Sequence, residues 1–526
     1  MRSVEIYDTT LRDGSQAEGI SFSVEDKLRI VQELDEFGIP YIEGGYPGSN
    51  PKDIEFFRRV RDLKLKKAVV VPFGSTRRAD TPPEQDANLN ALLETELPVI
   101  TIFGKSWKLH VREVLRTSLD RNLQIIEDSI RYLVSKGRKV IYDAEHFYDG
   151  YKDDPEYALE TLEAAVRGGA CRLVLCDTNG GSLPSEIKKI TEAVAEKFDV
   201  PLGIHAHNDS GMAVANSIMA VEAGAIHVQG TVNGYGERCG NADLCALIPN
   251  LQIKMGIKCI PDESLKRLTS LSILVSELAN LSHDDRQPYV GRSAFAHKGG
   301  MHIDAVRKTT RSFEHIDPAL VGNQRRVLIS EQAGKSAILM KVEDEFPNLD
   351  KNSPEAQELF RRLKEAEKEG YQYEAAEASF KLLANKVLGR YRPLFEVLGF
   401  RIITDSFPVD GDHVIRSEAT IKVKDPKGNI EHTAAEGDGP VNAMDMALRK
   451  ALETFYPELK DVHLTDFKVR VLDSRSGTAA KVRVLIETSD GEEVWGTIGV
   501  SENIIKASWD ALVDSLEYKL FKARKG

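Results

Sequence analysis

Residues 139–178 begin with the strand-like run KVIYDAEH (139–146), continue with the helix-like PEYALETLEAAVR (155–167) and end with RLVLCDT (172–178). A strand followed by a helix and a second strand is typical of a parallel βα unit. Polar residues follow both strands, at the edge of the sheet where the carboxyl ends of parallel strands meet. The same alternation continues on both sides of this stretch.

The first half of the chain repeats this strand–helix pattern. Residues 23–37 have helical spacing, with Val24, Leu28, Val31 and Leu34 on one face. Eight units in about 255 residues match the size of a TIM barrel, so we expect an α/β fold with a TIM (β/α)8 barrel over residues 1–260. A doubly wound open sheet is the alternative, although no GxGxxG follows the first strand. The expected strands are Val4–Thr10, Tyr41–Gly45, Lys67–Phe73, Val99–Gly104, Lys139–His146, Arg172–Thr178, Pro201–His207 and Ala225–Val232.

Two further regions follow the predicted barrel. Residues 261–398 are mostly helix-like and predict helical linker subdomains. Residues 399–526 predict a C-terminal α+β domain, with an internal repeat at an offset of 64 that aligns Thr433 with Thr497 and Ala443 with Ala507. Each copy would contain a few strands and one helix, although chance matching of Ala and Leu in helices is an alternative. The expected strands are 414–423, 467–472, 480–487 and 494–500.

Composition excludes several classes of protein. The net charge is −12, which argues against nucleic-acid binding or binding to an anionic membrane. No apolar run approaches the ~18 residues of a membrane helix, and the polar first residues do not resemble a secretory signal. The five cysteines form no CxxC pair, so free thiols in a reducing cytoplasm are expected.

The segment GIHAHND (203–209) carries the strongest local signal of chemistry. Side chains alternate along a strand, so His205 and His207 point to the same side. They stand at the end of the seventh expected strand, which is the active face of a TIM barrel. Two imidazoles there can hold one divalent metal, although an accidental HxH pair packed in the barrel is the alternative.

The segment DTTLRDG (8–14) follows the first expected strand and reaches the same face. Asp13 would add an oxygen ligand to the two nitrogens, a mixture that suits Zn, Mn, Mg or Co. Arg12 can form a forked contact with a carboxylate or stabilise an enolate oxygen. A surface ion pair after a strand is the alternative for these two residues.

Further polar residues follow other expected strands. Glu145 comes after the fifth strand and Thr178 after the sixth. The loop NGYGERCGN (233–241) follows the eighth, and its Asn241 can supply an additional oxygen ligand. A flexible connection is an equally good explanation of the glycines in this loop.

With these motifs, the chain resembles the 2-isopropylmalate, homocitrate and citramalate synthases of the DRE-TIM metallolyase superfamily. The similarity covers nearly the whole chain, and EGGYPG (43–48) is most similar to the citramalate synthase branch. The segment EGDGPV (436–441) is similar to the regulatory domain of these synthases. The matching motifs are DTTLRDG (8–14), HAHND (205–209), NGYGERCGN (233–241) and GMHID (300–304).

The resemblance implies a metal site with Asp13, His205 and His207 as ligands and Asn241 as a further one. It also implies that Arg12 and Thr178 bind a 2-oxo acid. Catalysis is expected to involve Arg12, Glu145 and His302, with Asp304 nearby; an imidazole such as that of His302 is suited to proton transfer near neutral pH. A homodimer is implied as well.

The resemblance also implies the reaction. We expect an acyltransferase that condenses acetyl-CoA with pyruvate in a Claisen-type step and then hydrolyses the product to (R)-citramalate and CoA. Isoleucine is the expected feedback inhibitor. The alternatives are 2-isopropylmalate synthase, homocitrate synthase, a lyase or carboxyltransferase with the same barrel, and a non-enzymatic sensor or scaffold. One departure from the family is Phe313, which stands where many relatives have a tyrosine.

Overall fold

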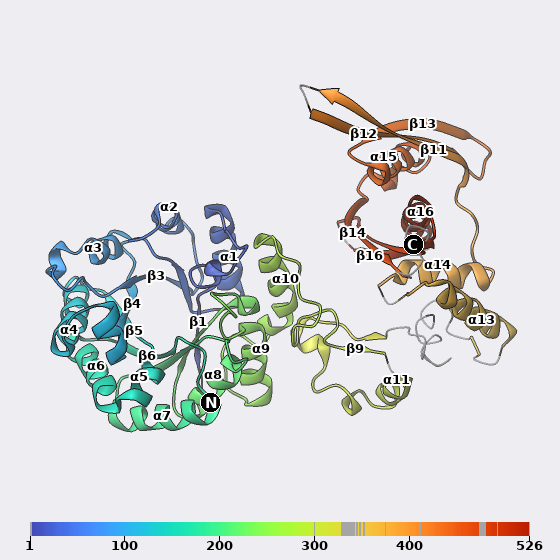
Figure 1. Cartoon of the computed structure of the whole chain (residues 1–526). Coiled ribbons are helices and arrows are strands. Elements are labelled where there is room, and N and C mark those ends of the chain that lie inside the picture. Colours follow the sequence, from blue (N-terminus) through green and yellow to red (C-terminus); the bar gives the residue numbers. More distant parts are fainter. Residues whose placement is uncertain are drawn as a thin grey trace. The chain divides into compact units, whose positions relative to one another are not determined.

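Eight parallel strands close into a barrel in the first part of the chain (Figure 1). Strand β1 pairs with β2 on one side and with β8 on the other, where Asp8 lies opposite Gly230. The TIM barrel is confirmed, and the open doubly wound sheet is wrong. Every expected strand is present, with ends displaced by at most two residues: β1 (Glu5–Asp8), β2 (Tyr41–Gly45), β3 (Val69–Ser75), β4 (Val99–Lys105), β5 (Lys139–Glu145), β6 (Arg172–Asp177), β7 (Leu202–Ala206) and β8 (His227–Gly230).

This computed structural model describes residues 3–298, 300–327, 353–373, 375–409, 412–472, 480–491 and 493–524, and residues 342, 346, 349 and 350. The chain forms two units. The first contains residues 1–295 and 316–325, and the second contains residues 296–315 and 326–526.

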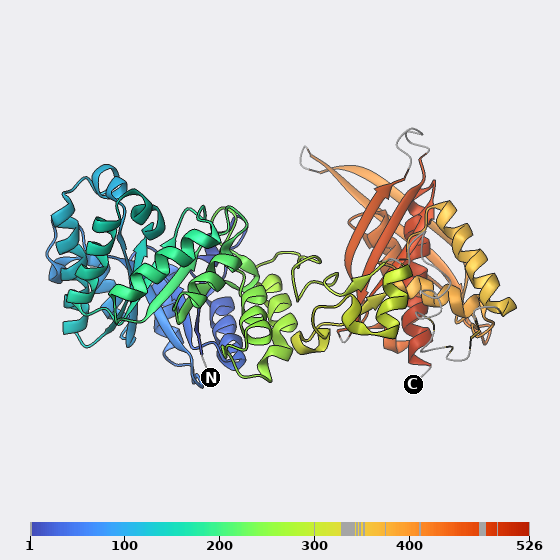
Figure 2. The same cartoon turned by 90° about the horizontal axis from the view of Figure 1, so that it is seen from below.

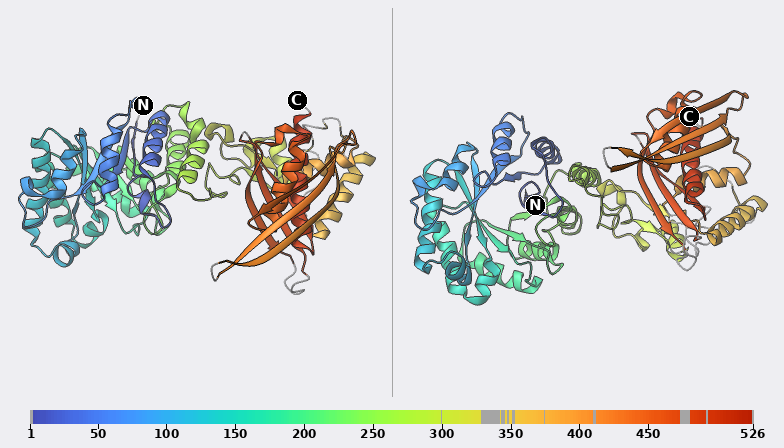
Figure 3. Two further views of the ribbon diagram at one scale, coloured as in Figure 1. Left: turned by 90° about the horizontal axis from the view of Figure 1, so that it is seen from above. Right: turned by 45° about the horizontal axis from the view of Figure 1, so that its top comes forward.

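Helices surround the barrel strands and bury their apolar faces against them (Figure 3, right). Helix α1 illustrates why they form where they do. Ser23 caps its first turn in a capping box with Asp26, and Gly38 ends it with a φ of 97°, a conformation that favours glycine. The helices are α1 (Val24–Phe37), α2 (Pro51–Val60), α3 (Ala87–Glu94), α4 (Leu119–Ser135), α5 (Phe147–Asp153), α6 (Pro155–Gly168), α7 (Pro184–Lys197), α8 (Ala213–Glu222), α9 (Leu244–Pro249) and α10 (Leu268–Leu278).

Within residues 261–398, the predicted helical linker, the described part contains helices joined by turns and loops, and one short ladder. Strands β9 (Ala296–His297) and β10 (Arg326–Val327) pair in parallel. The helices are α11 (Gly300–Lys308), α13 (Pro354–Glu369) and α14 (Glu377–Val387). The part of the prediction that covers residues 328–341 lies outside the described residues.

The C-terminal repeat is confirmed as two units of three antiparallel strands and one helix. The first sheet, β11 (Glu396–Val409), β12 (Asp412–Lys424) and β13 (Ile430–Gly437), precedes α15 (Pro440–Glu453). The second, β14 (His463–Val471), β15 (Val482–Ser489) and β16 (Val494–Ser501), precedes α16 (Ile504–Ala523). Figure 2 shows α16, in red, beside the strands of its sheet. The sequence analysis missed β11 and β13. The sequence of β13 has no apolar run, and none of its residues is fully buried.

Within the described part of the chain, no helix combines the length and apolar character needed to cross a bilayer.

Candidate active site

A cavity of about 480 Å³ opens at the carboxyl ends of the barrel strands. This is the face at which TIM-barrel enzymes carry their active sites. Seven of the eight predicted site residues belong to the barrel unit, and six of them line this cavity. Those six are Arg12, Asp13, Glu145, Thr178, His205 and His207.

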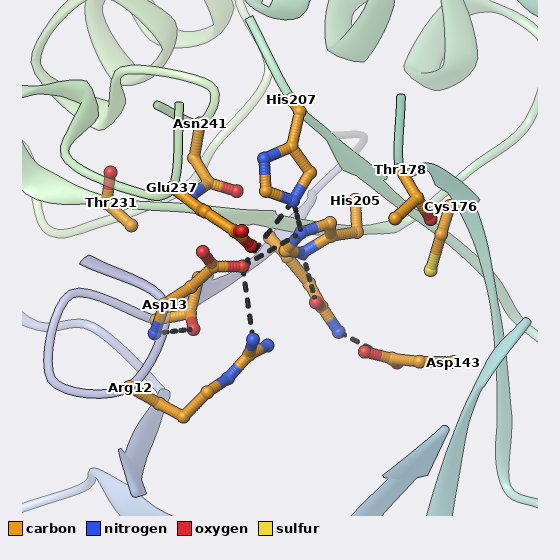
Figure 4. A network of polar contacts seen from close by, with 12 residues as sticks. Arg12, Asp13, Asp143, Cys176, Thr178, His205, His207, Thr231, Glu237 and Asn241 are labelled. Carbon is orange, nitrogen blue, oxygen red and sulfur yellow. Dashed lines mark hydrogen bonds and ion pairs between the residues drawn. The ribbon is translucent and has the colours of Figure 1, made fainter. Parts of the chain in front are cut away.

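The structure brings together Asp13, His205 and His207 (Figure 4). Oδ2 of Asp13 lies 3.3 Å from Nε2 of His205 and 3.7 Å from Nε2 of His207. The two Nε2 atoms are 3.3 Å apart. All three side chains are buried, and their ligand atoms lie within 4.8 Å of one another. One ion could contact all three.

Asn241 adds an amide oxygen next to this group. A backbone bridge joins Asn241 to His207, and Figure 4 shows the two side chains next to each other. Nδ2 of Asn241 donates to the carbonyl oxygen of Tyr235 at 3.2 Å, whereas Oδ1 is buried without a hydrogen-bond partner among the described residues. Oδ1 of Asp13 is unpartnered in the same way. Buried oxygens without partners beside two imidazoles fit a divalent cation.

The charges around these ligands perturb their protonation. Burial opposes ionisation of Asp13, but Arg12 and the two histidines hold the pKa of Asp13 well below its usual range. Burial also disfavours charged His205, yet Asp13 raises its pKa. Burial and the neighbouring His205 lower the pKa of His207 to about 4. His207 is therefore neutral at pH 7, as a metal ligand must be.

Arg12 is held in place by a carboxylate that the sequence analysis did not assign to the site. Nε of Arg12 donates to Oε1 of Glu43 at 2.5 Å, and Nη1 donates to Asp13 at 3.1 Å. Glu43 is fully buried and also accepts hydrogen bonds from Tyr7 and Thr9, both at 2.6 Å. In the sequence, Glu43 is the first residue of EGGYPG (43–48), within an expected strand. Glu43 orients the guanidinium toward the cavity.

Glu145 and Thr178 line the other side of the cavity. Lys105, at the end of β4, forms an ion pair with Glu145. The backbone N–H of His146 donates to Oγ1 of Thr178 at 2.8 Å. His146 has a φ of 57°, an uncommon conformation for a residue with a Cβ. Oγ1 of Thr178 accepts this bond and donates in no hydrogen bond among the described residues, so its hydroxyl hydrogen can be given to an acceptor in the cavity.

His302 belongs to the second unit, where it lies on α11. Its imidazole stacks on Phe313 with 4.0 Å between ring centroids and 22° between ring planes. Asp304 forms an ion pair with Lys308 at 2.7 Å. The structure therefore places the side chains of His302 and Phe313 together within the second unit.

Family models match three consecutive parts of the chain. Residues 3–275 match the HMGL-like family, which is half of the chain. Residues 289–370 match the homocitrate synthase post-HMGL domain-like family, and residues 374–520 match the LeuA allosteric (dimerisation) domain.

Individual relatives are similar over their whole length. The chain is 55% identical to the (R)-citramalate synthase of Geobacter sulfurreducens, covering 100% of this chain and 99% of that protein. It is 53% identical to the (R)-citramalate synthase of Aquifex aeolicus, over 99% and 98% of the two chains. A probable 2-isopropylmalate synthase of Methanopyrus kandleri is 33% identical over 97% of each chain. This chain, with its HMGL-like barrel, belongs to the (R)-citramalate synthase family.

Proposed function

We propose that this chain condenses acetyl-CoA with pyruvate and hydrolyses the thioester, giving (R)-citramalate and CoA, as a step in isoleucine biosynthesis. The observation that carries the choice of pyruvate is the difference in identity between two kinds of relative. The two citramalate synthases are 53% and 55% identical to this chain, against 33% for the probable 2-isopropylmalate synthase. All of them align over nearly their whole length, so the difference is not one of coverage.

Asp13, His205 and His207 would hold a divalent metal, with Asn241 as a further ligand. The unpartnered buried oxygens of Asp13 and Asn241 support this assignment. The mixed nitrogen and oxygen donors suit Mn, Mg, Zn or Co. When bound, such a metal would polarise the ketone of the 2-oxo acid and stabilise negative charge on its oxygen.

Arg12 and Thr178 would hold the substrate carboxylate and ketone. A guanidinium has five N–H donors, and Glu43 and Asp13 engage only two of those of Arg12. The remaining donors can form charge-assisted hydrogen bonds to pyruvate. Oγ1 of Thr178 accepts from His146 and keeps a hydroxyl hydrogen that it can donate.

The proton transfers would involve His302 and Glu145. A base must remove one methyl proton from acetyl-CoA, after which the enolate carbon attacks C2 of pyruvate and the ketone oxygen takes up a proton. Water then attacks the thioester, and CoA leaves as a thiol. His302 is the proposed base, and Glu145, held by Lys105 at the cavity wall, would assist the transfer.

We also propose a homodimer that isoleucine inhibits. The support is the match of residues 374–520 to the LeuA allosteric (dimerisation) domain. The five cysteines are free, as is usual in a reducing compartment, which supports a cytoplasmic location.

The test is CoA release from acetyl-CoA with an added divalent metal and one of three substrates: pyruvate, 2-oxoisovalerate or 2-oxoglutarate. We expect the highest kcat/KM with pyruvate, by about tenfold or more. A preference for 2-oxoisovalerate would make the chain a 2-isopropylmalate synthase. Absence of CoA release with all three would favour a lyase or carboxyltransferase.

A further inference from the structure

The two imidazoles of the candidate metal site differ in what lies behind them. Nδ1 of His205 is 2.8 Å from Oε1 of Gln229, and Nε2 of Gln229 donates to Oδ1 of Asp143 at 3.1 Å. Nδ1 of His207 is buried and has no hydrogen-bond partner in the described part of the chain. Of the two rings, His205 alone is held through a row of side chains.

This row crosses the inside of the barrel. Asp143 lies on β5, Gln229 on β8 and His205 on β7. Strands β5 and β8 are not neighbours in the barrel, so the hydrogen bond between Asp143 and Gln229 spans its interior. All three residues are buried, with at most 5% of any of them exposed. Few competing partners are available there, so the row has a defined arrangement.

The direction of each hydrogen bond follows from the chemistry of the side-chain amide. In the structure, the NH2 group of Gln229 faces Asp143 and donates to its Oδ1. The oxygen of the Gln229 amide then faces His205 and can only accept, so Nδ1 of His205 carries the hydrogen. The lone pair of the ring is left on Nε2, the atom that lies 3.3 Å from Oδ2 of Asp13.

We infer that Asp143 and Gln229 fix the tautomer and the orientation of the His205 imidazole for metal binding. This pair of residues is called the relay below. Without Asp143, the Gln229 amide could turn over and present its NH2 group to Nδ1. The hydrogen would then move to Nε2, and the lone pair would be lost from the side that faces Asp13. Groups that fix the tautomer and orientation of a ligand histidine in this way commonly change metal affinity by ~10–100-fold. The inference rests on the metal-binding role proposed for His205.

The test uses the full-length protein and Co²⁺, whose binding is measured by calorimetry and by the visible absorption of the bound ion. Gln229→Leu keeps the shape of the side chain but removes both hydrogen bonds, and we expect Co²⁺ affinity to fall by ~10–100-fold. Asp143→Ala should weaken binding in the same direction. The double variant Gln229→Glu/Asp143→Asn again gives Nδ1 an acceptor, and we expect affinity within about threefold of the parent protein.

A matched control separates positioning from general stability. Asn216 is a fully buried amide of the same unit that donates to Ser182 and Asp177. Asn216→Leu should lower the Tm of the metal-free protein without changing Co²⁺ affinity or the Co²⁺ spectrum. The relay is wrong if Gln229→Leu binds Co²⁺ as tightly as the parent, or if the double variant binds no better than Gln229→Leu. If the parent protein binds no Co²⁺, the metal site proposed above fails, and the relay fails with it.

Discussion

Nε of Arg12 lies 2.5 Å from Oε1 of Glu43, and this fully buried carboxylate anchors the guanidinium at the cavity. The guanidinium carbon also lies 3.8 Å from the centroid of the Phe73 ring. A flat cation held by a carboxylate at its edge and an aromatic ring against its face has little freedom to rotate. Arg12 is thus fixed before a substrate arrives.

Glu43→Gln should impair substrate binding through Arg12. The amide can still accept one hydrogen bond, but the charge that holds Arg12 is lost. We expect KM for pyruvate to rise by about tenfold or more, since charge-assisted hydrogen bonds are worth roughly 1.5–3 kcal/mol. Steady-state kinetics at saturating acetyl-CoA measure this effect. An unchanged KM would show that Glu43 serves the fold and not the orientation of Arg12.

Removal of the metal should abolish CoA release, and Mn²⁺ or Co²⁺ should restore it. Asp13→Asn should prevent the restoration at moderate metal concentrations, because a buried anionic ligand is lost. We expect its metal affinity to fall by roughly a hundredfold or more. Substitution of a residue that only contacts a metal ligand commonly costs ~10–100-fold, and Asp13 would itself be a ligand. Dialysis against a chelator and titration of both proteins with Mn²⁺ provide the measurement. Full activity of the chelated parent would rule out the metal role.

Glu145→Gln should lower kcat more than it changes KM for pyruvate. The neutral amide keeps the size of the side chain but cannot take a proton, and general acid–base catalysis typically contributes ~10²–10⁴-fold. Lys105→Met should have a smaller effect in the same direction, because it removes only the ion-pair partner of Glu145. Single-turnover measurements of CoA release separate the chemical step from product release. Equal kcat values for Glu145→Gln and the parent would exclude Glu145 from proton transfer.

Asp8→Asn should change the pH dependence of stability. Burial raises the pKa of Asp8 to about 7, against hydrogen bonds from Thr10 that lower it. Between about pH 4 and pH 7 the folded protein therefore binds a proton that the unfolded chain releases. The stability of the parent relative to Asp8→Asn should fall as the pH rises through this window, by up to about 1.4 kcal/mol per pH unit.

Calorimetric Tm values of the parent and Asp8→Asn across this pH range provide the check. The Tm of the parent, measured relative to that of Asp8→Asn, should fall as the pH rises. A constant difference would show that the pKa of Asp8 is the same in the folded and unfolded protein, against this prediction.

Phe313→Ala should reduce activity, whereas Phe313→Tyr should preserve it. The ring of Phe313 stacks on His302, and we expect its role to be contact with the imidazole, for which a hydroxyl is not required. The ring is 48% exposed, so a tyrosine hydroxyl has room. We expect Phe313→Ala to lower kcat by about tenfold, since a mispositioned group commonly costs up to ~10²-fold. A tenfold or greater increase in kcat for Phe313→Tyr would instead indicate that a tyrosine hydroxyl at this position acts as a general acid.

The sequence was sufficient to predict the barrel and the grouping of Asp13, His205 and His207, because both depend on local patterns. Alternation along a strand places His205 and His207 on one side, and a TIM barrel brings Asp13 to the same face. Glu43 and Gln229 were not predicted as part of the site. Both act through contacts between strands that are distant in sequence. Glu43 begins the EGGYPG motif, but the motif does not show that its carboxylate contacts Arg12, and Gln229 lies in no motif at all.

In the C-terminal domain too, the sequence predicted only those strands whose apolar residues alternate. β12 was predicted because apolar residues alternate along it, and its Ala419, Ile421 and Val423 are buried. The side chains of β13 alternate between exposed and partly buried positions, but its sequence has no alternation of apolar and polar residues. β13 is a strand because it forms backbone hydrogen bonds with β12 in an antiparallel ladder. Such pairing cannot be predicted from the residues of β13 alone.

The pairing of β1 with β8 sets the time at which the residues of the proposed metal site come together. Asp13 follows the first strand and Asn241 the last, and about 230 residues separate them in the chain. At ~5–20 residues per second, a ribosome needs roughly ten seconds or more to synthesise that interval. The nascent chain therefore carries Asp13 for this period without the ligands that complete the site. If the proposed metal site binds an ion, all of its ligands come together only after the barrel has closed.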